Sequence, residues 1–156
     1  MLAPEIRKLS ETKGGIMKPK EYLSQYQTMK YEYEEARRQY LALRIDAETV
    51  AGVRYDKEKI QSSSTQDLSD VVIALLKARD MMEKKYTKYL HKMMEIRDAI
   101  DAVPDARARE LLKRRYIDFQ SFEQIQDEMA YEAGTIYNYH GKALLFIKVP
   151  SSDEKK

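Results

Sequence analysis

Apolar residues recur at alternating spacings of three and four along the N-terminal part of the chain. From about Pro19 to Thr49 they form one continuous seam, made up of Tyr22, Tyr26, Met29, Tyr33, Ala36, Tyr40 and Leu43. A second seam runs from about Leu68 to Val103, with Arg79 at one unfitting position, and is made up of Leu68, Val72, Leu75, Met82, Tyr86, Tyr89, Met93, Ile96 and Ile100. Such heptad-like spacing is typical of helices that pack along their length. Because the two seams have similar lengths, the pattern predicts an antiparallel, coiled-coil-like helical hairpin over residues 17–103.

The segment between the two seams differs in composition. We expect Gly52 to end the first helix, and residues 53–67 include a run of hydroxyl side chains at 62–65. Such a run favours a loop, with Asp67 or Ser69 as the cap of the second helix. This segment shows no motif whose mechanism can be stated, so its role stays open.

Residues 1–16 are unlike the rest of the chain. Lys13, Gly14 and Gly15 lie just before Met17, and Lys-Gly-Gly is what a purine-rich ribosome-binding site gives when translated. Met17 is therefore a candidate for the natural start, with residues 1–16 as an extension without function. A genuine flexible N-terminus fits the same residues.

The C-terminal part predicts three shorter helices after Pro104. Asp105 is placed to cap a helix from Ala106 to Tyr116, whose apolar stripe is Ala108, Leu111, Leu112 and Tyr116. After a turn at 117–120, Ser121 and Gln124 form a capping-box pattern at the start of a short helix, with Phe122, Ile125 and Met129 inward. A turn at 130–132 leads to a last helix from Ala133 to Lys148, whose inward face is Ile136, Tyr139, Ala143, Leu144 and Ile147. The whole chain is thus predicted to be all-α, with a three-helix unit over 104–149 and a polar tail over 150–156.

Composition narrows the class of protein. Of 156 residues, 35% are charged, and glycine and proline number only 5 and 4, which suits long exposed helices. The chain has no cysteine, so disulfides and thiolate metal sites are excluded. The longest apolar run, Val71 to Leu76, is far too short to span a bilayer, and no signal-peptide pattern opens the chain. We therefore expect a cytoplasmic protein, without membrane contact.

Charge is balanced overall but segregated in the C-terminal unit. The net charge is +2, and residues 104–148 hold seven basic and seven acidic side chains. Five of the basic side chains belong to the first short helix: Arg107, Arg109, Lys113, Arg114 and Arg115. Residues 133–148 contain Lys142 and Lys148 and no acid. This modest basic bias fits nucleic-acid contact, and ordinary solvated faces are the alternative.

The spacing of the last two predicted helices is that of a helix-turn-helix. From Ala108 to Leu144 the sequence resembles region 4 of sigma factors, over about forty residues without gaps, on Arg115-Tyr116, Ser121, Ile125, Met129, Thr135-Ile136-Tyr137 and Ala143-Leu144. The resemblance implies a DNA-binding unit that also contacts RNA polymerase. Departures at Ala130, Glu132, Gly134 and Gly141, where the family has a glycine, a hydroxyl cap or basic residues, leave fewer phosphate donors.

The chain beyond Met17 also resembles a group of Gram-positive phage and prophage proteins related to ArpU- and RinA-type late transcription regulators. The resemblance rests on the long helical N-terminal region, the segment around Tyr55 to Asp67 and the terminal helix-turn-helix. It implies a phage-encoded regulator, with late-gene control as the expected role, inside a bacterial host cell.

Helix-turn-helix geometry then names the residues expected at DNA. The exposed start of the last helix would face the major groove, which places Ala133, Gly134, Tyr137 and Asn138 there. Asn138 can pair with an adenine edge, whereas packing on neighbours is the alternative for Tyr137. Contacts to the DNA backbone are expected from His140, Lys142, Arg107 and Arg114, and a solvated face is the alternative for the arginines.

Enzymatic function is not indicated. His91 and His140 are far apart in sequence, and the chain contains no Gly-rich phosphate loop and no metal-ligand spacing of the E-x-x-H kind. We expect no cofactor and no metal. The expected partners are double-stranded DNA, RNA polymerase and a second copy bound through the hairpin. The alternative function is a protein-interaction module that docks on RNA polymerase or on a phage packaging or assembly machine.

Overall fold

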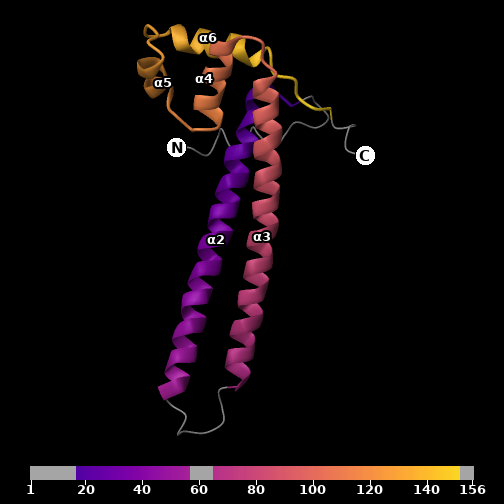
Figure 1. Cartoon of the computed structure of the whole chain (residues 1–156), viewed down its shortest axis with the longest axis vertical. Helices are drawn as coiled ribbons and strands as arrows, with labels where there is room; N and C mark the ends of the chain where they lie inside the picture. The colour runs from indigo at the N-terminus through magenta and orange to yellow at the C-terminus, as the bar shows by residue number, and fades with distance from the viewer. Residues whose placement is uncertain (1–16, 57–64, 152–156) are drawn as a thin grey trace, which may run out of the picture. The chain divides into compact units, whose positions relative to one another are not determined.

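The computed structural model describes residues 17–56 and 65–151, and for 53–56 and 65–67 the backbone alone. The described residues form helices and contain no strand (Figure 1). The helices are α2 (Pro19–Asp56), α3 (Thr65–Asp101), α4 (Ala106–Tyr116), α5 (Phe122–Glu128) and α6 (Thr135–Leu144). The predicted all-α class, with two long helices followed by three short ones, is confirmed. No helix in these ranges is long and apolar enough to cross a membrane. The expectations about residues 1–16 and 152–156 lie outside the described residues.

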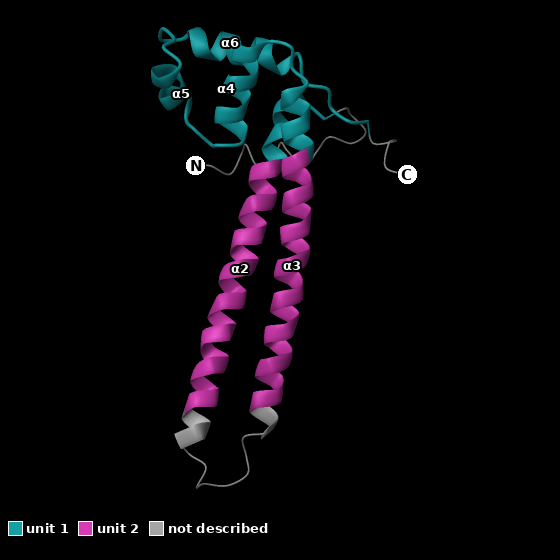
Figure 2. Ribbon diagram, viewed as in Figure 1, with its two compact units in different colours: residues 1–25, 95–156 teal, residues 26–94 magenta. Residues whose placement is uncertain are grey.

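The chain divides into two compact units (Figure 2). The first unit contains residues 17–25 and 95–151, so it joins the outer ends of the two long helices to the three short helices. The second unit, residues 26–94, is the helical hairpin proper. We describe each unit by itself below.

Tyrosines hold the two helices of the hairpin unit together. The ring of Tyr26 stacks on that of Tyr89 with centroids 5.4 Å apart, and the two hydroxyls are 3.2 Å apart. Tyr33 packs between Tyr86 and Tyr89, at 5.0 and 5.7 Å. These contacts join residues near the start of α2 to residues near the end of α3, so the helices run antiparallel, as predicted.

The predicted seam of α3 is wrong in register at Val72, which is 42% exposed, and the inner face follows Val71, Ala78, Lys85 and Lys92. Tyr86 is 43% exposed and lies at the edge of this face, where its ring still contacts that of Tyr33 on α2. These positions keep a strict alternation of three and four with the other seam residues, so they also remove Arg79 from the seam. A lysine can lie there because its aliphatic stem packs along the seam while the ammonium group reaches the edge. The Lys85 ammonium does so, 2.7 Å from the Glu32 carboxylate.

The long helices also end elsewhere than expected. Gly52 does not end α2, which continues to Asp56, because one glycine inside a long helix costs only about 1 kcal/mol. Helix α3 begins at Thr65, so Asp67 and Ser69 lie within it and are not its caps. Of the segment predicted as a loop, residues 57–64 lie outside the described part.

The first unit has a core shared by all of its elements. Leu111, Leu112, Ile125 and Ile136 of the short helices are fully buried, as the apolar stripes predicted. Equally buried are Leu23, Ile96 and Ile100 from the ends of the two long helices, and Val103 just after α3. The short helices therefore do not complete a core by themselves.

Helix α6 is shorter than predicted. It covers Thr135–Leu144 instead of 133–148. It starts later because Gly134 takes a left-handed conformation (φ 85°) directly before it, and it ends earlier because the N–H groups of residues 145–147 bond to carbonyls three residues back instead of four. Glycine adopts this conformation without steric cost, so it sets where the helix starts. Ile147 is buried just beyond the helix, which confirms its inward side chain.

Candidate nucleic-acid interface

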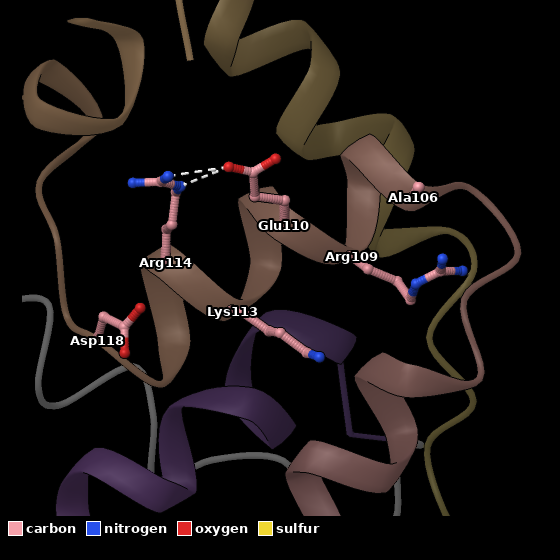
Figure 3. A pocket seen from close by; sticks show the side chains of 6 residues that line it. All are labelled: Ala106, Arg109, Glu110, Lys113, Arg114 and Asp118. Carbon is pink, nitrogen blue, oxygen red and sulfur yellow. Dashed lines mark hydrogen bonds and ion pairs between the residues drawn. The ribbon is translucent and has the colours of Figure 1, made fainter. Parts of the chain in front are cut away.

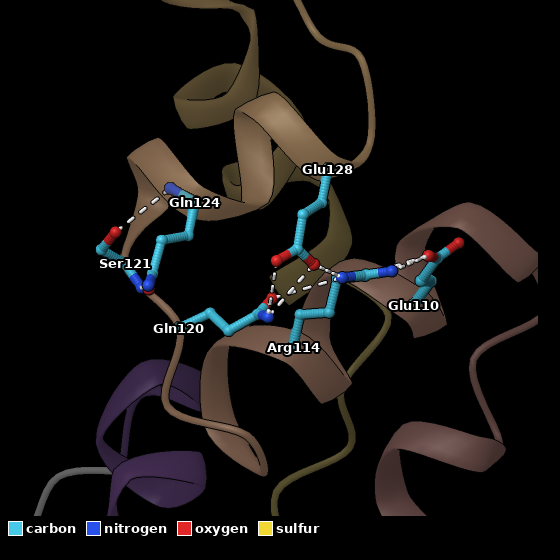
Figure 4. Close-up of polar contacts among 6 residues, drawn as sticks. All are labelled: Glu110, Arg114, Gln120, Ser121, Gln124 and Glu128. Atoms are coloured by element: carbon cyan, nitrogen blue, oxygen red, sulfur yellow. Dashed lines mark hydrogen bonds and ion pairs between the residues drawn. The ribbon is translucent and has the colours of Figure 1, made fainter.

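Two caps fix the helices of the C-terminal unit. Asp105 accepts a hydrogen bond from the Arg107 backbone N–H at 3.0 Å, and its other oxygen accepts one from the Tyr139 hydroxyl at 2.6 Å, which ties the start of α4 to α6. The Tyr139 hydroxyl holds the pKa of the Asp105 carboxyl below its usual range. At α5, Ser121 accepts from the Gln124 backbone N–H (3.1 Å), and the Gln124 side chain accepts from the Ser121 N–H (2.9 Å; Figure 4). The predicted cap and capping box are both confirmed.

A short turn joins α5 to α6 and gives the pair the form of a helix-turn-helix. Met129 is buried at its start, and Ala130 has a positive φ of 55° where a glycine is more common. Ile125 and Ile136, one from each helix, are fully buried on the side that faces α4. The opposite face of α6 is exposed.

Most residues predicted to read DNA are exposed. Asn138 and Lys142 lie on that face of α6, and Ala133 and Gly134 lie just before the helix. Tyr137 is 58% exposed, although its ring also packs on that of Phe122 with centroids 5.0 Å apart. The tyrosine is thus held in place by a neighbour and still offers its outer edge.

His140 is the exception on α6, because its side chain is buried. It is only 8% exposed, its Nε2 lies 2.8 Å from the Tyr116 hydroxyl, and the Phe122 ring meets it edge-on. Burial, together with the nearby charges of Lys20 and Arg115, lowers the pKa of His140 to about 4. The expected contact of His140 with DNA backbone is therefore wrong: this residue is a neutral part of the core.

The two arginines predicted to contact phosphate are engaged within the protein. Arg107 donates to the Met129 carbonyl at 3.1 Å, and its guanidinium lies 4.6 Å from the centre of the Tyr131 ring. Arg114 pairs with Glu110 at 2.9 Å and also with Glu128 (Figure 4). A phosphate would have to compete with these partners.

The remaining cations of α4 are occupied as well. Arg109 donates to the Val103 carbonyl at 2.6 Å, and Arg115 donates to the Gln120 carbonyl at 2.9 Å while it covers the Phe122 ring at 4.4 Å. Lys113 pairs with Asp101 at 2.6 Å. The sequence suggested a phosphate-binding cluster or a solvated face. Instead, these side chains stabilise the ends and turns of the unit.

A shallow pocket beside α4 also offers no free cation for a phosphate. Its lining carries charges of both signs, and Arg114 is turned towards Glu110 (Figure 3). The lining residues are Ala106, Arg109, Glu110, Lys113, Arg114 and Asp118. Its cations already have partners. Among the described residues, no group of three or more histidines or acids is placed to hold a metal ion.

Lys142 differs from the cations of α4. It projects from the exposed face of α6, and over residues 17–56 and 65–151 it has neither an ion pair nor a side-chain hydrogen bond. With Asn138 one turn earlier on the same face, it forms the polar part of the open surface. We call Ala133, Gly134, Tyr137, Asn138 and Lys142 the reading face.

Comparison with known proteins gives one match. No curated protein and no solved structure matches the chain. Residues 49–147, which include α3, α4, α5 and α6, match the family described as "Protein of unknown function (DUF1492)". Since this match covers more than half of the sequence, the chain belongs to the DUF1492 family.

Proposed function

We propose that this protein binds double-stranded DNA through the reading face of α6 and regulates transcription. The observation that carries the proposal is the helix-turn-helix itself: α5 and α6 are locked on α4 by a buried core, while α6 keeps its outer face open. A helix so supported fits the major groove of B-DNA. The proposal assigns the chain no catalytic activity.

Each residue of the reading face has a role in this proposal. The Asn138 amide offers a donor and an acceptor, which is the pattern that recognises an adenine edge. Lys142 neutralises a phosphate. The backbone N–H groups that follow Thr135 in the first turn of α6, for which Gly134 provides no side-chain cap, donate to another. The outer edge of Tyr137 meets a thymine methyl or a phosphate.

The finer identity is also a proposal. The resemblance to region 4 of sigma factors, and to phage and prophage late regulators, supports a role in phage late-gene control with RNA polymerase as a second partner. The internal engagement of the α4 cations means that one copy offers few phosphate donors, so we expect modest affinity from a single reading face.

The test is a selection of random duplexes with the full chain, followed by fluorescence anisotropy on the selected and on scrambled DNA at several salt concentrations. We expect enrichment of a defined site, and a slope of log K against log salt that is small because few phosphates are contacted. A folded chain that enriches no sequence and does not bind duplex DNA at low salt would contradict the proposal.

A second candidate is docking on a protein, and one observation favours it. At the end of α6, Leu145 is 83% exposed and Phe146 47% exposed, and large apolar side chains at such a position fit a protein contact. Binding of purified RNA polymerase that is lost in Leu145→Ser, together with no DNA binding, would favour this alternative.

A further inference from the structure

Helix α3 carries a second stripe beside its seam with α2, and Tyr86 belongs to both. The stripe follows spacings of four and three through Val72, Leu76, Arg79, Glu83, Tyr86 and Leu90. At 3.6 residues per turn it lies about 110° around the helix from the inner seam. Val72, Leu76 and Tyr86 are 42%, 58% and 43% exposed and Leu90 is half-buried, so the stripe lies at the surface of the hairpin unit, although the Tyr86 ring also contacts Tyr33. We call it the outer stripe.

The outer stripe is symmetric about its centre. Val72 and Leu90, Leu76 and Tyr86, and Arg79 and Glu83 are each equidistant from position 81. If two copies of α3 pack antiparallel about a twofold axis at that point, apolar residues meet apolar residues at both ends. At the centre, Arg79 of each copy meets Glu83 of the other. A twofold interface requires this kind of self-complementarity.

We propose that the protein forms a twofold dimer through the outer stripe, with a second copy of this chain as the partner. The inference goes beyond DNA binding and does not depend on it. The stripe is about 27 Å long, counted from Val72 to Leu90 at 1.5 Å per residue, which is enough for a continuous helix–helix contact.

The packing of the hairpin unit supports a partner along its length. Among its described side chains, only Tyr26, Ala36 and Lys92 are buried, so two helices alone leave most of the seam half-exposed. Two hairpins packed through α3 bring four helices together, the number with which a bundle encloses a core.

The charges of the stripe identify the occupant. The Arg79 guanidinium and the Glu83 carboxylate are 3.0 Å apart and 60% and 59% exposed in one chain. A lipid surface or an apolar ligand would offer no partner for the two charges in the middle of the stripe. In the antiparallel dimer they become a network of four alternating charges, in which each arginine gains a second carboxylate.

Charge reversal tests the pairing, with sedimentation equilibrium of the full chain as the measurement. Arg79→Glu alone, and Glu83→Arg alone, place like charges opposite each other twice per dimer. We expect either change to raise the Kd of the dimer at least about tenfold. The double variant, Arg79→Glu with Glu83→Arg, restores both cross-pairs and should return the Kd to within about threefold of the original.

A matched control is available on the same helix. Lys84→Glu changes the net charge as Arg79→Glu does, and it removes another ion pair between positions four apart, that of Lys84 with Asp80 at 2.8 Å. Position 84 lies about 120° around α3 from the stripe, so the dimer should be unaffected. Leu76→Ser, which truncates an exposed side chain, should yield a monomer of unchanged helicity by circular dichroism.

Three results would overturn the proposal. These are a full chain that stays monomeric at 100-fold the concentration used for DNA binding, a dimer that Arg79→Glu and Leu76→Ser leave intact, and a double variant as weak as the single ones. Loss of DNA binding in a chain that still dimerises would contradict the proposed function and leave the dimer standing.

Discussion

Asn138 and Lys142 lie on one face of α6 and should act differently at DNA. Asn138→Ala removes a bidentate partner of a base, so it should cost about 1–3 kcal/mol on the selected site and relax preference at one base pair. Lys142→Ala removes a phosphate contact, so it should weaken binding to all sequences alike and reduce the salt slope by about one unit. Anisotropy on selected and scrambled duplexes measures both.

Neither change should disturb folding, because both side chains are exposed. Thermal unfolding of the two variants serves as the control. Unchanged DNA binding in both, with folding intact, would mean that α6 is not the reading helix and would favour the protein-docking alternative.

The buried His140 predicts a stability that depends on pH. Its pKa of about 4 in the folded protein lies below the value near 6.5 of an unfolded histidine, so the unfolded chain binds the proton more tightly. The free energy of unfolding should therefore fall as the pH is lowered from about 6.5 to about 4, by on the order of 2–3 kcal/mol. Above pH 6.5 the contribution is fully present. Denaturant titrations at pH 7.5 and pH 5 measure it.

The control is His140→Gln, which keeps a polar partner for Tyr116 and cannot take up the proton. Carboxylates titrate in the same range, so the difference between the two proteins isolates the histidine. Parallel pH profiles for the original chain and the variant would show that His140 is solvated in the folded state.

At the residue scale, the sequence predicted which side chains of α6 are exposed, but it did not predict the hydrogen-bond partners of the arginines. The exposure of Asn138 and Lys142 could be predicted from helical spacing alone, because the pattern of apolar residues on a short amphipathic helix determines which side chains face outward. The partners of Arg107 and Arg115 are backbone carbonyls of Met129 and Gln120, in turns that exist only after the three helices pack. No pattern of side chains along the chain reports such a bond.

At the scale of elements, the capping box of α5 should make a measurable contribution to the free energy of unfolding. Ser121→Ala removes the acceptor for the Gln124 backbone N–H and should lower the free energy of unfolding by about 1 kcal/mol. Ser24→Ala is the matched control in the same unit, because the Ser24 hydroxyl only donates to the Lys20 carbonyl one turn earlier. Alanine favours a helix interior, so that change should be neutral or slightly stabilising. Equal losses in the two variants would contradict the role of the cap.

Caps could be predicted because they depend on residues within four positions of each other. The register of α3 could not, because choosing between Val72 and Val71, or between Tyr86 and Lys85, requires knowing what α2 offers opposite. Glu32 decides one of these choices by pairing with Lys85. Val72 is then left outside and Tyr86 lies at the edge of the seam, and both belong to the outer stripe.

At the scale of the whole molecule, residues 104–151 should not fold alone. Such a fragment lacks Leu23, Ile96, Ile100 and Val103, which are fully buried in the first unit. A buried side chain of this size contributes about 1.5–3 kcal/mol, so the loss is comparable with the whole stability of a domain, about 5–15 kcal/mol. Circular dichroism during thermal unfolding should show no cooperative transition.

A shortened chain provides the comparison. Residues 17–36, linked by a short Gly-Ser segment to residues 82–151, retain the helix ends and should unfold cooperatively. Cooperative unfolding of the 104–151 fragment at a similar temperature would contradict the shared core.

The sequence predicted five helices in the right order because each has a clear apolar period. It did not indicate that the ends of the long helices belong to the core of the short ones. Ile96 and Ile100 continue a heptad rhythm that is equally consistent with a hairpin contact, and Leu23 lies outside the predicted seam, beside Tyr22. Residues of the shared core differ from those of the hairpin seam in being completely buried, and this burial depends on the short helices that pack against them.

The arginine bonds to carbonyls bear on how the protein behaves in concentrated electrolyte. Mobile ions weaken the attraction between exposed opposite charges over a screening length of about 10 Å at 0.1 M, which shortens as salt is added, but a carbonyl oxygen has no net charge to screen. The hydrogen bonds from Arg107, Arg109 and Arg115 to backbone carbonyls should therefore persist at salt concentrations that weaken exposed ion pairs. In the proposed DNA complex, salt therefore acts on the phosphate contacts more than on these turns, so the salt slope reports how many phosphates are contacted.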